Sequence, residues 1–231
     1  MNKVSTTRVT LLAITLLASV LGFAGDFAET KATAPGVSAQ VLSQPGLPIE
    51  ITDVSLQSDI VTRETTLHYS VMNRAQEPLK QLSFFIVAFD SSGDVEGGQA
   101  ACEAADVAPG AIQVRTLRLG NLLYLDPNED YARVVVSVEG ARTERAAWAS
   151  TLEPTQVVAA MRDGDTAPVG RAGLGSLGTL AATCPLTFCD SCFDKAIAAC
   201  KCGIKSFSCI TNGSCTCSFT CQDRTPGCLQ E

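Results

Sequence analysis

The chain of 231 residues carries 24 acidic and 17 basic residues, giving a formal net charge of −7, and it contains 11 cysteines. An acidic chain without a cluster of Lys or Arg lacks the feature that binds phosphate backbones, so nucleic acid is not expected as a partner. Ten of the cysteines lie between Cys184 and Cys228. A stretch so short needs disulfides or a metal in order to fold.

Residues 1–24 have the pattern of a secretory signal peptide. Lys3 and Arg8 precede an apolar run at 9–23, and small residues follow near Ala24. This run of 15 residues is shorter than the roughly 20 that span a membrane, although an uncleaved anchor is the alternative. We therefore expect a secreted or periplasmic protein with no stable membrane insertion after signal cleavage. Such compartments are oxidising, which favours disulfides.

Residues 48–150 are predicted to form one β domain. Residues 25–47 before it mix Ala, Gly, Ser and Pro without apolar periodicity and are predicted to be a linker. Seven short runs, separated by turn residues, then predict a seven-strand antiparallel immunoglobulin-like sandwich, a mainly β fold. The expected strands are Ile49–Leu56, Thr65–Asn73, Gln81–Asp90, Val95–Ala101, Ala111–Leu119, Tyr131–Glu139 and Thr143–Ala149. The third is apolar on both faces and is expected at the centre of its sheet.

Two short stretches carry family resemblances. Leu125, Pro127, Tyr131 and Val134 form an L-x-P-x-x-x-Y-x-x-V pattern. This pattern resembles fibronectin type III domains, in which the tyrosine hydrogen-bonds back to the preceding loop. Asn73 and the run 85–93 resemble, more weakly, bacterial extracytoplasmic domains of the FxLYD kind. Both resemblances imply an immunoglobulin-like fold and neither implies an enzyme, while an ordinary Pro-Asn turn is the alternative explanation.

Residues 151–183 are rich in Gly and Ala and are predicted to be a second linker that holds a short helix near Thr155–Met161. Residues 184–231 are predicted to form a separate cysteine-rich module stapled by disulfides. Within it, Asp190 or Ser191 can begin a helix that Gly203 ends. One apolar face of this helix, Phe193, Ala196, Ile197 and Cys200, is expected to pack on the rest of the module.

A hairpin is expected after this helix. Ile204–Ile210 and Ser214–Cys221 flank an Asn-Gly pair, which is a strong hairpin signal. Alternation places the hairpin cysteines on one face, so the helix is expected to cover that face. The order of helix and hairpin resembles the cysteine-stabilised αβ scaffold of defensin-like modules. Cys189 and Cys192 are three residues apart, however, and that family places its helix cysteines four apart.

Every cysteine of the tail is expected to lie in a disulfide, although the sequence does not specify the pairing. These are Cys184, Cys189, Cys192, Cys200, Cys202, Cys209, Cys215, Cys217, Cys221 and Cys228. Because their number is even, Cys102 is expected to be a buried free thiol. The alternatives for Cys102 are a bond to one tail cysteine or to a second chain.

No assembled catalytic set is found, so no catalytic residue, metal or cofactor is assigned. The single histidine, His68, is expected to be an exposed strand residue, and residues 90–96 to be a solvated turn and not a calcium loop. The sequence predicts a non-enzymatic binding or structural protein of the cell envelope or extracellular space. Its cysteine-rich tail would present an interaction surface to an unidentified protein or surface partner.

Two alternative functions remain open at this stage. Cys189 and Cys192 form a C-x-x-C at a helix start, where the helix dipole lowers a thiol pKa, so a thiol-disulfide oxidoreductase is one alternative. The other is binding of a soft metal, zinc or copper(I), through the cysteine cluster.

Overall fold

The computed structural model describes residues 37–42, 46–119, 124–126, 129–150, 152–163, 172–174, 188–211 and 215–222. The predicted signal peptide at 1–24 lies outside these residues, as do Cys184, Cys228 and the Asn212-Gly213 pair. No helix in the described part of the chain is both long enough and apolar enough to cross a membrane.

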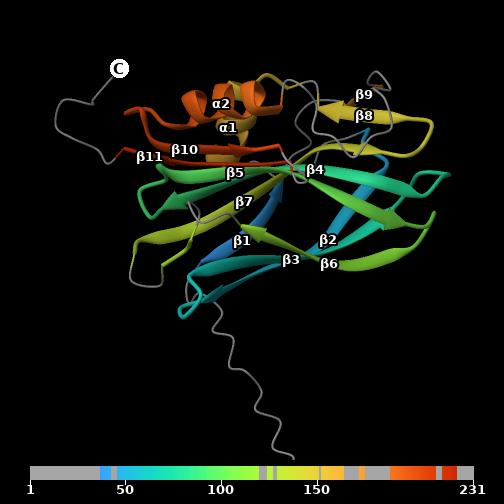
Figure 1. Ribbon diagram of the computed structural model, residues 1–231, viewed down its shortest axis with the longest axis horizontal. Coiled ribbons are helices and arrows are strands. Elements are labelled where there is room, and N and C mark those ends of the chain that lie inside the picture. The colour runs from blue at the N-terminus through green and yellow to red at the C-terminus, as the bar shows by residue number, and fades with distance from the viewer. Residues whose placement is uncertain are drawn as a thin grey trace, which may run out of the picture. The chain divides into compact units, whose positions relative to one another are not determined.

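The body of the protein is a sandwich of two sheets, and the prediction of a mainly β fold is confirmed (Figure 1). One sheet has three antiparallel strands in the order β2-β3-β6, where β2 is Ile49–Asp59, β3 is Glu64–Asn73 and β6 is Ile112–Leu119. The facing strands follow the order β5-β4-β7-β8, with β4 at Leu79–Asp90, β5 at Val95–Val107, β7 at Tyr131–Arg142 and β8 at Ala147–Ser150. All seven predicted strands are therefore present.

The last of these strands begins later than predicted. The sequence placed its start at Thr143, whereas β8 begins at Ala147. Thr143 and Ala146 instead close a turn, in which the Thr143 amide donates to the Ala146 carbonyl at 2.9 Å. The Thr143 hydroxyl accepts from the Ala146 amide at 3.0 Å, so a side chain that favours strands is used here to fix a turn.

The larger sheet has eight strands because four further strands join it. These are β1 (Ser38–Leu42), β9 (Ala172–Leu174), β10 (Ile204–Ile210) and β11 (Cys215–Cys221). The order is β10-β11-β5-β4-β7-β8-β9, and β1 pairs in parallel with β7. The segment 25–47, predicted to be a linker, thus contains a strand, and so does the segment 151–183.

The tail hairpin continues the sheet of the sandwich and does not hang apart from it. β11 pairs antiparallel with β5, from Cys215 opposite Cys102 to Thr220 opposite Gly97. Without this hairpin, β5 would expose a row of unpaired backbone groups at the edge of the sheet. The hairpin satisfies those groups, which is the physical reason why the tail and the sandwich share one sheet.

Two helices cover the outer face of the eight-stranded sheet (Figure 1). α1 is Pro154–Asp163 and includes the predicted helix at 155–161, and α2 is Phe188–Ala199. α2 begins two residues before Asp190. Gly203 follows its end with φ of +100°, and the Gly203 amide donates to the Cys200 carbonyl at 3.0 Å. A residue with a side chain adopts this conformation rarely, so the predicted role of Gly203 in ending the helix has a clear basis.

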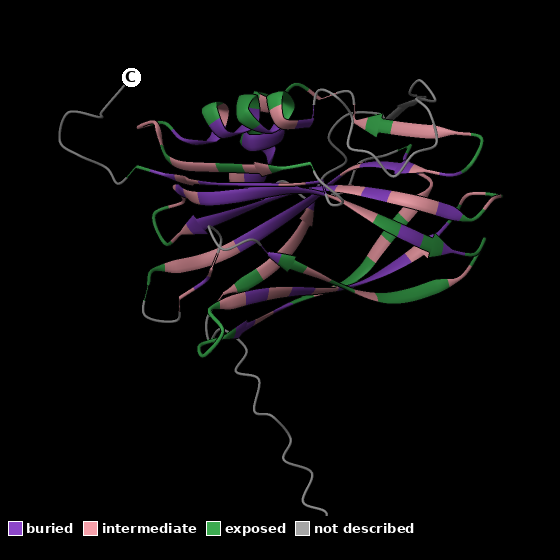
Figure 2. Ribbon diagram, in the orientation of Figure 1, coloured by how far each residue is buried: buried purple, intermediate pink, exposed green. Residues whose placement is uncertain are grey.

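β4 separates two apolar cores. Phe84, Ile86 and Ala88 belong to the core between the two sheets. Phe85, Val87 and Phe89 belong to the core between the larger sheet and the helices. All six side chains are at most 2% exposed, and the residues in the middle of this sheet are coloured as buried in Figure 2. The prediction that this strand is central is confirmed.

Candidate functional site

Within the described residues, three disulfides join α2, or Cys200 directly after its end, to the tail hairpin. Cys189 is bonded to Cys209, Cys192 to Cys217 and Cys200 to Cys221, with Cα–Cα distances of 5.9, 6.5 and 5.0 Å. Cys202 and Cys215 are disulfide-bonded as well. Cys209 and Cys217 are opposite one another in the hairpin, so both strands present cysteines to the helix on the same face. α2 therefore lies over the cysteine-bearing face, as the alternation of the sequence predicted.

The rotation of α2 about its axis differs from the prediction. Ala196 and Cys200 are buried as expected, but Phe193 is 44% exposed and Ile197 is 57% exposed. The buried face instead includes Cys192, because the bond from Cys192 to Cys217 turns that side of the helix toward the hairpin. The covalent bonds thus orient the helix and leave Phe193 and Ile197 exposed.

These two side chains border an apolar groove between α2 and β10. The groove has a volume of about 460 Å³ and is lined by Phe193, Ile197, Cys200, Gly203, Ile204, Lys205, Ser206 and Phe207. The rings of Phe193 and Phe207 meet edge to face, with their centroids 5.2 Å apart. β10 is also the terminal strand of the sheet. Sequence periodicity could not reveal this groove because it assigned Phe193 and Ile197 to the inner face.

A buried ion pair holds α2 from its other side. The Lys195 ammonium donates to Glu139 Oε2 of β7 at 2.9 Å, and the two side chains are only 11% and 13% exposed. The Ser137 hydroxyl donates to the second carboxylate oxygen at 2.6 Å. The Lys195 ammonium also lies 5.0 Å from the ring centroid of Phe85. Since a buried charge needs partners, this arrangement is best understood as an anchor for the helix.

Neither alternative function gains an assembled site. Cys189 and Cys192 are not bonded to each other, because each is bonded to a different strand of the hairpin. Exchange chemistry at a C-x-x-C needs a thiolate, and neither sulfur is free in this structure. For the soft-metal alternative, no group of three or more His, Cys, Asp or Glu side chains suited to a metal is found within the described residues.

The acidic segment at 90–96 forms a tight turn between β4 and β5. The Asp94 amide donates to Asp90 Oδ1 at 2.8 Å, and Gly93 has φ of +81°. The carboxylate of Asp90 therefore serves the turn, in agreement with the turn predicted for this segment. His68 is half-buried on β3, where its Nε2 lies 3.1 Å from Gln57 Oε1. It is less exposed than predicted, and its hydrogen bond is to a side chain of the neighbouring strand.

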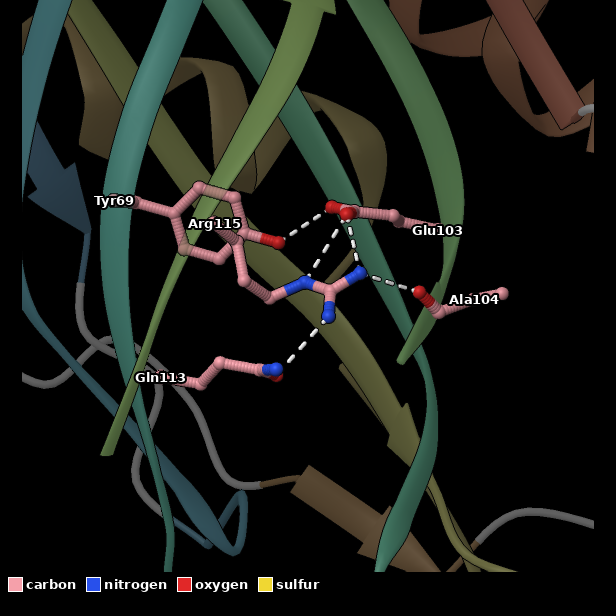
Figure 3. A network of polar contacts seen from close by, with 5 residues as sticks. All are labelled: Tyr69, Glu103, Ala104, Gln113 and Arg115. Atoms are coloured by element: carbon pink, nitrogen blue, oxygen red, sulfur yellow. Dashed lines mark hydrogen bonds and ion pairs between the residues drawn. The ribbon is translucent and has the colours of Figure 1, made fainter. Parts of the chain in front are cut away.

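One polar network connects the two sheets, and sequence patterns did not reveal it (Figure 3). The Tyr69 hydroxyl of β3 donates to Glu103 Oε2 of β5 at 2.5 Å. Arg115 of β6 donates to Glu103 Oε1 from Nε at 3.0 Å, and to the Ala104 carbonyl from Nη2 at 2.6 Å. Burial raises the pKa of Tyr69 far above its usual value, and the Glu103 carboxylate raises it further. Because these side chains hydrogen-bond to one another across the sandwich, the network links β5 of the larger sheet to β3 and β6 of the smaller sheet.

Tyr131 makes a contact of the kind that its motif implied. Its hydroxyl donates to the Tyr124 carbonyl, seven residues earlier, at 3.3 Å. Leu125 of the same motif is fully buried. Comparison with protein-family models, curated proteins and solved structures finds no match to this chain. The functional class must therefore be inferred from the geometry described above.

Proposed function

We propose that this is an exported, non-enzymatic binding protein of the cell envelope or extracellular space. Its disulfide-linked helix and hairpin present the apolar groove between α2 and β10 to a protein or surface partner. The partner contributes apolar side chains, because the groove walls are formed mainly by Phe193, Ile197, Ile204 and Phe207.

The disulfides support the location outside the cytosol. Three bonds between α2 and the hairpin are stable in an oxidising compartment, such as the periplasm or the extracellular space. The apolar run at 9–23 supports export by a signal peptide. The hydrogen bond from Tyr131 to the Tyr124 carbonyl supports kinship of the sandwich with fibronectin type III domains.

The exposure of Phe193 and Ile197 is the observation that carries the binding role. Each fully buried side chain of this size contributes roughly 1.5–3 kcal/mol to folding. A 12-residue helix that leaves two such side chains in water forgoes this contribution. The disulfides compensate by holding the helix in place, so the outward apolar surface is available for binding.

Site-specific photocrosslinking in the native host tests this proposal. A benzoylphenylalanine placed at position 193 is expected to form a discrete crosslinked product. Ile197→Asp in the same chain is expected to abolish that product without lowering the melting temperature by more than a few degrees. The matched control carries the same photoreactive residue at Ile112 of β6, which is 58% exposed but does not line the groove.

Two crosslinking results would contradict the binding role: the absence of any product from position 193, and the appearance of the same products from positions 193 and 112.

Export is tested separately. Intact mass and thiol titration of the native protein should show the tail cysteines oxidised. A tail with all its thiols free would overturn the exported, disulfide-stapled account.

A further inference from the structure

The free thiol of Cys102 lies directly opposite a disulfide-bonded cysteine. Cys102 of β5 and Cys215 of β11 are Cα partners in the antiparallel pairing of these strands. Cys102 is free and Cys215 is disulfide-bonded. Residues opposite one another on neighbouring strands point to the same face of a sheet. Both side chains pack in the core beneath the helices, so the thiol and the disulfide share one environment.

The separation of the two backbones fits a bond between their sulfurs. Residues directly opposite in an antiparallel pair have Cα atoms roughly 4.5–5.5 Å apart. Disulfides form between cysteines whose Cα atoms are roughly 4.4–6.8 Å apart. A Cys102–Cys215 bond therefore needs rotation of the two side chains and no rearrangement of the strands.

The charged surroundings of Cys102 set the rate at which it can react. Burial raises the pKa of its thiol to about 11, and the ammonium of Lys195 on α2 acts in the opposite direction. Glu139 of β7 pairs with that ammonium, while Ser83, the partner of Cys102 on β4, is uncharged. Near neutral pH the thiol is almost entirely protonated. The disulfide opposite it therefore persists near neutral pH.

We propose that Cys102 and Cys215 form an internal thiol-disulfide exchange pair. The Cys102 thiolate attacks Sγ of Cys215, the bond between Cys215 and its present partner breaks, and that partner leaves as a thiolate. The proton given up by Cys102 is taken up by the leaving sulfur. One disulfide is replaced by another and the number of free thiols is unchanged, so the step needs no oxidant or reductant.

The exchange changes how the tail is held. Afterwards a covalent bond links β11 to β5, directly across the sheet, and the free thiol belongs to the tail. The exchange would thus move the free thiol from β5 of the sandwich to the tail.

Alkylation followed by peptide mapping tests this pair. The oxidised full-length protein is incubated at pH 7, 8, 9 and 10, quenched with acid, alkylated after denaturation and digested without reduction. A linked peptide that joins Cys102 to Cys215 is expected, together with an alkylated cysteine of the tail. Because the thiolate fraction rises tenfold per pH unit below the thiol pKa, the initial rate is expected to rise about tenfold per unit.

Cys102→Ser is the matched control, since it removes the attacking sulfur without breaking any disulfide. At each pH it is expected to release no tail thiol, and the rate in the wild type is expected to be independent of protein concentration. The proposal is overturned if no Cys102–Cys215 peptide forms up to pH 10. It is equally overturned if Cys102→Ser releases the same tail thiol, or if the new bond joins two chains.

Discussion

Two buried polar side chains, those of Asn73 and Gln99, hydrogen-bond to the backbone of other segments of the fold. Asn73 is fully buried, and its Nδ2 donates to the carbonyls of Glu77 and Val107, at 2.9 and 2.7 Å. Gln99 of β5 is also fully buried and donates from Nε2 to the Arg118 carbonyl of β6 at 3.1 Å. A sequence shows only that such residues are polar. Their partners are 4 to 34 residues away along the chain, so these bonds become visible only once the strands are placed.

The raised pKa of Tyr69 makes the free energy of unfolding depend on pH in the alkaline range. Its pKa is raised by burial and by Glu103, whereas in an unfolded chain it is about 10. The folded state therefore keeps this proton above pH 10 while the unfolded state loses it. The contribution to stability is complete below pH 10 and is lost as the pH rises from 10 toward the raised pKa. The slope is at most about 1.4 kcal/mol per pH unit for one tyrosine.

Urea unfolding at pH 9, 10 and 11, followed by Trp148 fluorescence, measures this slope. In a Cys102→Ser background, which prevents thiol exchange, Tyr69→Phe is expected to make the free energy of unfolding fall less steeply above pH 10. Some slope should remain, because the pKa of Tyr131 is also raised, by burial and by Glu129. Equal slopes with and without the Tyr69 hydroxyl would exclude this explanation.

At the scale of elements, the joint between β11 and β5 depends on the absence of a side chain. Gly98 of β5 is opposite Phe219 of β11. A Cβ built on Gly98 would lie 2.5 Å from Phe219 Cζ and 2.8 Å from the Ile86 carbonyl oxygen. The ring of Phe219 is fully buried and stacks on Phe85, with centroids 6.2 Å apart. The sequence showed Gly98 only as one of two consecutive glycines in a predicted strand.

Gly98→Ala is therefore expected to destabilise the protein, by about 1–3 kcal/mol, since overpacking a well-filled core has costs of this size. The midpoint of chemical unfolding gives the change. Phe219→Leu in the same chain is expected to recover part of the loss, because it removes the ring atoms nearest to the added methyl group. If the double variant is as unstable as the sum of the two single variants, the Phe219 contact is not the cause.

At the scale of the whole molecule, the central strands of the sandwich and the tail share one sheet and one core, so we expect them to unfold cooperatively. The core beneath the helices contains Phe85 of β4, Val135 of β7 and Phe219 of β11, together with α2. The backbone ladder also runs without interruption from β10 through β4 to β7. The loss of the hairpin would therefore expose both an apolar core and the edge of β5.

Hydrogen exchange of the oxidised protein can test this cooperativity. The amides of β11 that pair with β5 are expected to show the same opening free energy as the amides of β4 in the centre of the sheet. Calorimetry should accordingly give a single unfolding transition for the tail and the sandwich. Two transitions, or faster exchange in β11 than in β4, would mean that the tail folds as an independent module.

The sequence by itself determined the local elements. Alternation, turn residues and cysteine spacing predicted all seven sandwich strands, the helix and hairpin of the tail and the central place of β4. These features depend on residues close together in the chain. The even number of tail cysteines predicted a buried free thiol at Cys102, which is free but only half-buried. Tertiary structure decided how these elements meet: the pairing of β11 with β5, the parallel addition of β1 to β7 and the rotation of α2. These depend on backbone edges that need partners and on which sulfurs bond, and neither is encoded in local periodicity.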